Sequence, residues 1–176
     1  IMLLQNLNKN YFNKNLNLVP IIFVILLSRF IPHPPNFTPI ISIAVLSPLF
    51  FNKNITSLSV IILGMFVTDI FLGIYPSMIF TYLTIILIFY FSKIFFKLDS
   101  FKSIILCSFL SSVIFFILTN FSVWFLSGLY SLNFEGLIAC YLLAIPFFHN
   151  TLISTMLFSS ITYFIFLRLK EKFIYN

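Results

Sequence analysis

The stretch ITSLSVIILGMFVTDIFLGI, residues 55–74, carries a single charged side chain, Asp69, in an otherwise mostly apolar run. At about 20 residues per crossing, a run of this length is typical of a transmembrane helix. A second run of the same character, Met78–Phe96, follows after the turn residues Tyr75 and Pro76. The two runs together predict a helical hairpin that crosses a membrane twice.

The composition of the whole chain agrees with this prediction. Of 176 residues, 61% are hydrophobic and only 8% are charged, and the mean hydropathy is +1.12. A soluble domain would need a surface of roughly 25–35% charged residues. The sequence therefore predicts an integral membrane protein. The net charge of +6 gives no support for nucleic-acid binding, because the lysines are scattered over separate loops.

The apolar runs between Lys, Asn and Pro clusters divide the chain into six predicted spans. They are Leu18–Ile31, Pro39–Phe51, Ile55–Ile74, Met78–Phe96, Ile104–Leu118 and Pro146–Leu167. The first, second and fifth are shorter than the length of about 20 residues that a crossing needs. The short second span predicts either an extension into residues 36–38 or a proline-rich loop that enters the protein interior.

This pattern predicts an all-α fold, a polytopic six-helix bundle. Residues 1–17 are expected to form a cytoplasmic or interfacial segment, 18–168 a single membrane domain, and 169–176 a basic cytoplasmic tail. The stretch Phe125–Gly136 reads as an outer turn, and Pro146 is expected to begin or kink the last span.

Basic residues predict the orientation, since Lys and Arg near span ends remain in the cytoplasm. With both termini inside, nine of the ten basic residues are cytoplasmic, and only Arg29 lies toward the other face. The nine are Lys9, Lys14, Lys53, Lys93, Lys97, Lys102, Arg168, Lys170 and Lys172. Three polar segments then share the outer face. The first is residues 29–39, the second is Thr68 and Asp69 followed by residues 73–76, and the third runs from Thr119 and Asn120 through His149 and Asn150.

The first polar segment reads RFIPHPPNFTP, residues 29–39. Its four prolines fix φ and remove backbone donors, so the chain should present His33 and Asn36 rigidly. Arg29 opposes the orientation rule and is therefore expected to have an anionic partner or ligand. A stiff connector, in which Arg29 reaches lipid headgroups, is the structural alternative.

Asp69 is the obvious partner for Arg29, because a carboxylate inside a membrane is normally paired. Such a pair either belongs to a binding site or only locks two spans together. Both interpretations place Asp69 toward the interior of the bundle.

The third polar segment offers Asn120, Trp124, Tyr141, His149 and Asn150 as further candidates. The aromatic members also fit an interfacial belt, and His149 also fits a satisfied core histidine. Cys107 and Cys140 show no disulfide or zinc pattern and are expected to be free thiols.

Four motifs together resemble a known group of proteins. They are residues 29–39, DIFLG at 69–73, TNFSVW at 119–124 and CYLLAIPFFHNT at 140–151. They look like a small uncharacterised family of bacterial integral membrane proteins, itself similar to the substrate-binding S components of ECF-type vitamin transporters. The resemblance covers about residues 18–168. Residues 21–28 depart from S components, since they lack the Ala-x-x-x-Ala pair that docks the coupling subunit.

The resemblance implies uptake of a vitamin-like or cofactor-like small molecule across the bacterial inner membrane. The ligand would lie at the extracytoplasmic end, held by the loops after spans 1, 3 and 5. Separate ATPase and coupling subunits are the implied partners.

We expect Arg29 and His33 to engage anionic or acceptor groups of such a ligand, and Asp69 to orient Arg29. Asn36, Asn120 and Asn150 are expected to contribute polar contacts, and Trp124 and Tyr141 stacking, in a site that His149 completes. We expect no bound cofactor or metal and no catalysis, since no Gly-x-Ser-x-Gly, His-Glu-x-x-His or phosphate-binding loop is found.

Two alternatives stay open at this level. One is a membrane assembly or scaffold protein without a ligand. The other is a haem- or quinone-binding protein that uses His33 and His149. Within the resemblance to S components, a solitary corrinoid-type component is a further possibility, with His33, His149 and Cys140 as axial donors to a cobalt centre.

Overall fold

A computed structural model describes residue 24 and residues 27–50, 54–97 and 100–174, with side chains up to 168. The expected N-terminal segment, most of the first span and several of the lysines lie outside the described residues. Five labelled helices make up most of the described chain, which contains no strand. They are α3 (Ile40–Phe50), α4 (Asn54–Leu72), α5 (Met78–Phe95), α6 (Phe101–Leu126) and α7 (Phe134–Ile174). Residues 27–30 form a further helical turn.

Four of these helices, α4 to α7, are long and apolar enough to cross a membrane. Their apolar side chains point outward as well as inward, which is expected of helices that face lipid rather than water. The predicted all-helical membrane fold is thereby confirmed, whereas the number of crossings and the orientation stay predictions.

The third and fourth predicted spans agree closely with α4 and α5, but the fifth and sixth were placed too short. Helix α6 continues eight residues past Leu118, and α7 begins twelve residues before Pro146 and passes through that proline. The outer turn is accordingly limited to residues 127–133, not Phe125–Gly136. Proline removes one backbone donor without ending a helix whose neighbours hold it in place, which is common in membrane helices.

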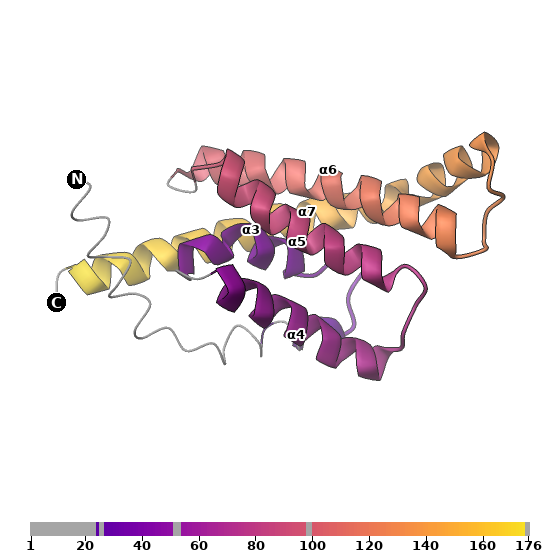
Figure 1. Cartoon of the computed structure of the whole chain (residues 1–176). Coiled ribbons are helices and arrows are strands. Elements are labelled where there is room, and N and C mark those ends of the chain that lie inside the picture. The colour runs from indigo at the N-terminus through magenta and orange to yellow at the C-terminus, as the bar shows by residue number, and fades with distance from the viewer. Residues whose placement is uncertain (1–23, 25–26, 51–53, 98–99, 175–176) are drawn as a thin grey trace.

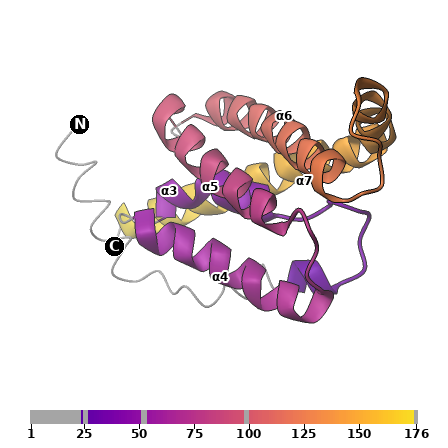
Figure 2. The same ribbon diagram turned by 45° about the vertical axis from the view of Figure 1, so that its right-hand side comes forward.

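The helices alternate in direction, so that the polar connections gather at one end of the bundle (Figure 1). Residues 31–39, 73–77 and 127–133 lie at that end, which we call the polar-loop end, and the C-terminal end of α7 lies at the opposite one. The α6–α7 hairpin projects furthest beyond the polar-loop end, as Figure 2 also shows. At the opposite end, Lys93 of α5 donates a hydrogen bond to Asn54 Oδ1 of α4 at 2.5 Å.

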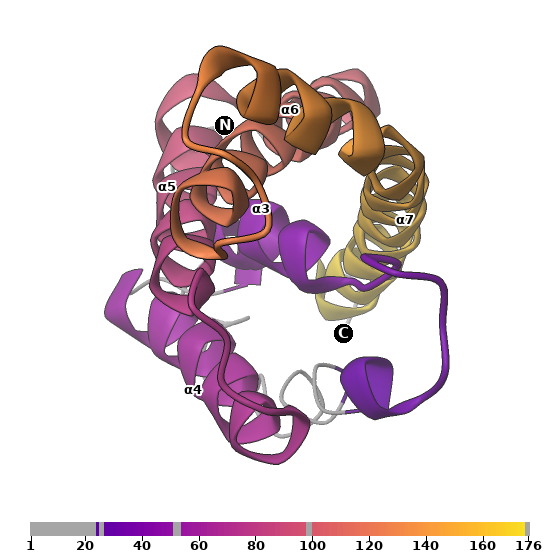
Figure 3. The ribbon, with the colours of Figure 1, turned by 90° about the vertical axis from the view of Figure 1, so that its right-hand side faces the viewer.

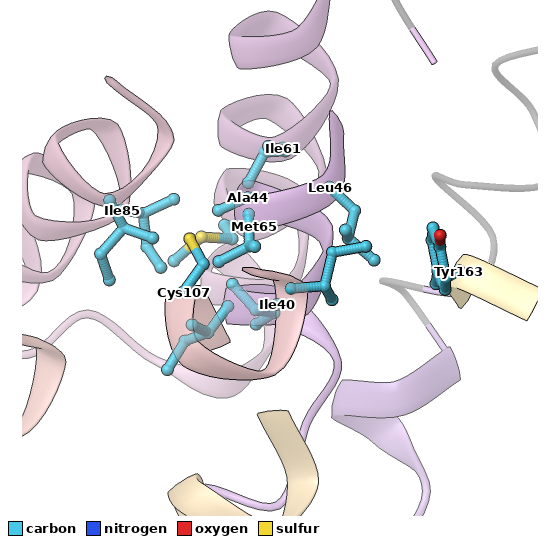
Figure 4. Packing of buried hydrophobic residues seen from close by; sticks show 12 residues of the cluster. Ile40, Ala44, Leu46, Ile61, Met65, Ile85, Cys107 and Tyr163 are labelled. Carbon is cyan, nitrogen blue, oxygen red and sulfur yellow. The ribbon is translucent and has the colours of Figure 1, made fainter. Parts of the chain in front are cut away.

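Helix α3 occupies the centre of the bundle, with α4, α5, α6 and α7 around it (Figure 3). It has only 11 residues, and Ala44, Val45 and Leu46 in its middle are completely buried. Side chains from α4, α5 and α6 complete the core around it, among them Ile61, Ile85 and Cys107 (Figure 4). A helix this short, at about 1.5 Å rise per residue, reaches through roughly half of a bilayer core.

Small hydroxyl side chains line the packed faces of α6 and α7, which have the most extensive contacts in the bundle. Those buried on α6 are Ser108, Ser111, Ser112 and Ser122, and those on α7 are Thr151, Ser154, Thr155 and Ser159. Small residues let two helices approach closely where lipid provides no hydrophobic drive for association. On α7 the small residues also face α3, since Ser42 of α3 donates to the Thr155 carbonyl at 2.9 Å.

Candidate functional site

A cavity of about 230 Å³ opens among the helices toward the polar-loop end. Its polar lining comes from the segment before α3, from the α4–α5 loop and from the start of α5. These residues are Arg29, His33, Asn36, Thr38, Tyr75 and Thr81. Its apolar lining consists of Ile40, Ile41, Met65, Leu72, Ile85 and Phe115.

The apolar floor lies deep in the bundle. Met65, Ile85 and Phe115 each stand near the middle of their helices, α4, α5 and α6. The cavity therefore combines hydrogen-bonding groups with hydrocarbon, and the Arg29 guanidinium lies as deep as Met65, whose carbonyl it contacts. Such a combination is typical of small-molecule sites.

Arg29 lines the cavity and is fixed there by three contacts to α4. Its Nη2 lies 2.5 Å from Asp69 Oδ1, and its Nη1 donates to Thr68 Oγ1 at 2.6 Å and to the Met65 carbonyl at 3.1 Å. The Asp69 side chain is 1% exposed and the Arg29 side chain 15%. The predicted Arg29–Asp69 pair is therefore present. Asp69 is buried, whereas Arg29 remains partly exposed and lines the cavity.

The second carboxylate oxygen of Asp69 is also satisfied. Tyr82 of α5 donates its phenolic hydrogen to Asp69 Oδ2 at 2.5 Å. The Oδ1 atom has no conventional hydrogen bond within the described residues, so the charge pairing with Arg29 is its stabilising contact. The network thus joins the 27–30 turn, α4 and α5.

Tyr82→Phe should destabilise the protein by about 1–3 kcal/mol, because it leaves a buried carboxylate oxygen without its donor. The loss should appear as a lower melting temperature in detergent. Tyr90→Phe, on an exposed position of the same helix, is the matched control and should melt like the wild type. Equal melting of both variants would contradict a stabilising role for the hydroxyl.

The proline-rich segment presents its side chains from a tight turn. The Phe37 amide donates to the Pro34 carbonyl at 3.0 Å, and Asn36 at the third position has a φ of +64°. Proline followed by a residue with positive φ is the signature of a type II turn, and asparagine tolerates that conformation better than most residues. The rigidity predicted from the prolines thus has a defined geometry.

Helix α7 anchors this turn. Asn150 Nδ2 donates to the Pro35 carbonyl at 3.1 Å, and Ser154 Oγ donates to the Asn36 carbonyl at 3.4 Å. Asn150 was predicted to contact a ligand, and the structure instead places it on the backbone that carries His33 and Asn36. This bond holds the loop in place, and a contact of Asn150 with a ligand stays a prediction.

His33 lines the cavity with a defined tautomer. Its Nδ1 lies 2.8 Å from the Pro34 carbonyl. A carbonyl oxygen only accepts, so Nδ1 must carry the hydrogen, and in the neutral ring Nε2 is then an acceptor.

The remaining candidates of the third polar segment do not line the cavity. Asn120 and His149 donate to carbonyls one turn back in their own helices, at Phe116 and Ile145. Trp124 donates to the Ser131 carbonyl and Tyr141 to the Ile117 carbonyl, both across the α6–α7 hairpin. His149 is exposed, and no contact joins it to His33 within the described residues.

Several lining residues were not among the sequence candidates. Thr38, Tyr75 and Thr81 line the cavity, and Thr68 and Tyr82 hold the ion pair. Tyr75 and Thr68 stood beside quoted motifs, and their polarity next to Asp69 was the available signal. Tyr82 stands four residues into an apolar span, where nothing separates it from an interfacial aromatic residue.

A second hollow, near the opposite end between α6 and α7, is almost entirely apolar and has only Lys102 as a polar lining residue. Cys107 and Cys140 are free and buried, and the described residues contain no group of three metal-ligating side chains. The cavity at the polar-loop end is therefore the candidate site.

Comparison with known families gives one match, to the family described as "Family of unknown function (DUF6580)", over residues 9–175. No curated protein and no solved structure matches the chain.

Proposed function

Because the chain belongs to the DUF6580 family of unknown function, we propose its function from the cavity: the protein binds a small molecule within the membrane and takes it up. The observation that carries the proposal is a cavity lined by Arg29, His33 and Asn36 together with apolar side chains from the middle of α4, α5 and α6. These three side chains were the candidates of the first polar segment.

The form of the site favours binding over a purely structural role. A buried ion pair alone would lock the helices without a cavity beside it, yet here Arg29 contacts Asp69 on one side and lines the cavity on the other. The turn that carries His33 and Asn36 is already fixed by α7, so little conformational entropy is lost when a ligand binds.

The size of the cavity limits the ligand. Drug-sized sites measure about 300–1,000 Å³, and this one, at about 230 Å³, suits a smaller metabolite. A corrin or haem is too large for it.

For uptake, we propose an arrangement like that of an ECF-type S component. The polar-loop end would face outward, and a separate ATPase would supply energy, since no nucleotide-binding motif occurs in the chain. The outward orientation agrees with Lys93, Lys102 and Arg168 at or near the opposite ends of their helices.

Mass spectrometry of small molecules that copurify in mild detergent tests the binding function. We expect a species in the wild type to be lost in Thr81→Trp, because the indole would fill the mouth of the cavity. Thr56→Trp, at an equally half-buried position near the other end of the bundle, should retain it. The same compound, radiolabelled, should accumulate in cells that express the wild type but not in cells that express Thr81→Trp. Identical small-molecule spectra for all three proteins would refute the site.

A further inference from the structure

We propose that the cavity selects an uncharged ligand with both a hydrogen-bond acceptor and a donor, as in an amide or lactam, and rejects carboxylates of the same shape. This inference rests on the proposed function and adds the chemical class of the ligand. It also replaces the expectation that Arg29 attracts an anion.

The charge of Arg29 is already balanced. Asp69 lies 2.5 Å from the guanidinium, is fully buried, and cannot retreat into water. A ligand carboxylate on Arg29 would be drawn by the cation and repelled by Asp69 at only slightly longer range. It would also lose its hydration in the cavity, and the remaining attraction does not offset that loss.

No other permanent charge is available to compensate an anion. Among the described lining residues Arg29 is the only one with a permanent charge, and the others are amide, hydroxyl, imidazole or apolar groups. Burial raises the pKa of Tyr75 above its ordinary value, so its phenol stays neutral and contributes only a hydroxyl.

The polar lining groups fit both ends of an amide. Arg29 uses Nη1 and Nη2 for its contacts to α4, and a guanidinium has five N–H donors, so it retains donors for a carbonyl. With Nδ1–H bound to Pro34, the Nε2 of His33 in its neutral ring is free to accept an N–H. The apolar floor of Met65, Ile85 and Phe115 takes the rest of the molecule.

Three probes of nearly the same planar shape separate the charge classes: benzamide, benzoate and benzamidinium. We would titrate each by calorimetry into the protein in phosphatidylcholine nanodiscs, with empty nanodiscs as the blank. Benzamide should bind roughly tenfold or more tightly than either ion, because the site rejects a charge that it cannot compensate.

Asp69→Asn supplies the decisive variant, since it frees the charge of Arg29 at constant shape. Its preference should move toward benzoate by roughly tenfold or more. Glu135→Gln makes the same acid-to-amide change on an exposed residue of α7 and should leave the preference of the wild type unchanged.

Each outcome decides a separate point. Benzoate binding as tightly as benzamide in the wild type would overturn the ligand class and leave the proposed function standing. An unchanged preference in folded Asp69→Asn would overturn the charge-balance argument. Failure of all three probes to bind the wild type would count against the cavity as a ligand site, and so against the proposed function itself. The wild-type comparison remains decisive if Asp69→Asn does not fold.

Discussion

Arg29→Ala should destabilise the protein by about 3–5 kcal/mol, because removal of one partner leaves the other charge of a buried pair uncompensated. The Asp69 carboxylate is 1% exposed and would keep only the Tyr82 hydrogen bond. We expect a large fall in melting temperature and in the yield of monodisperse protein, measured by size-exclusion chromatography after heating in detergent.

A double replacement separates the buried charge from lost packing. Arg29→Leu with Asp69→Leu removes both charges together and should recover most of the stability, since apolar replacements of buried ion pairs are often neutral or better. Lys102→Ala, an exposed basic residue at the opposite end, is the control and should melt like the wild type. If Arg29→Ala alone were as stable as the wild type, the ion pair would contribute nothing to the fold.

Gly136→Ala should disrupt the α6–α7 turn, at a cost of about 1–3 kcal/mol or more through overpacking. An added Cβ at Gly136 would overlap the backbone oxygen of Ser131. That oxygen also accepts the indole hydrogen bond of Trp124 at 3.0 Å, and the Gly136 amide donates to Asn133 Oδ1 at 2.8 Å. The turn therefore cannot move aside without breaking the contacts that shape it.

Hydrogen exchange over residues 127–137 measures this effect directly. Faster exchange there, with a lower melting temperature, is expected for Gly136→Ala. Gly128→Ala is the contrasting variant: its φ of +72° disfavours alanine, but no atom lies near the new Cβ, so a penalty of only about 1 kcal/mol is expected. Exchange equal to the wild type in Gly136→Ala would show that the turn has room for the methyl group.

The sequence was most informative where charge is scarce. Asp69 and Arg29 are costly in hydrocarbon, so their pairing could be predicted from 40 residues apart in the chain, and the structure brings them together. The spans of α4 and α5 could also be predicted, because turn residues mark the boundary between them. The prediction ended α6 too early, because Thr119 and Asn120 satisfy their polar groups within their own helix and need no loop. It began α7 too late, because Pro146 was taken as the start of a span whose helix passes through that proline.

In the candidate site, too, some residues could be recognised from local sequence and others could not. Arg29, His33 and Asn36 were recognisable from their local sequence and line the cavity. The role of Asn150 depends on a contact across 115 residues, which no local pattern reveals. Helical spacing grouped three further residues with the site, Asn120, Trp124 and Tyr141. In the structure their side chains donate to backbone carbonyls of the α6–α7 hairpin.

The brevity of helix α3 has a consequence for passage through the bilayer. Its 11 residues span only about half of a bilayer core, and Ile40 and Ile41 at its N-terminal end line the cavity. If the protein takes up a solute as proposed, that solute would lie against the end of α3. Passage to the other side would then require α3, or the helices packed around it, to move.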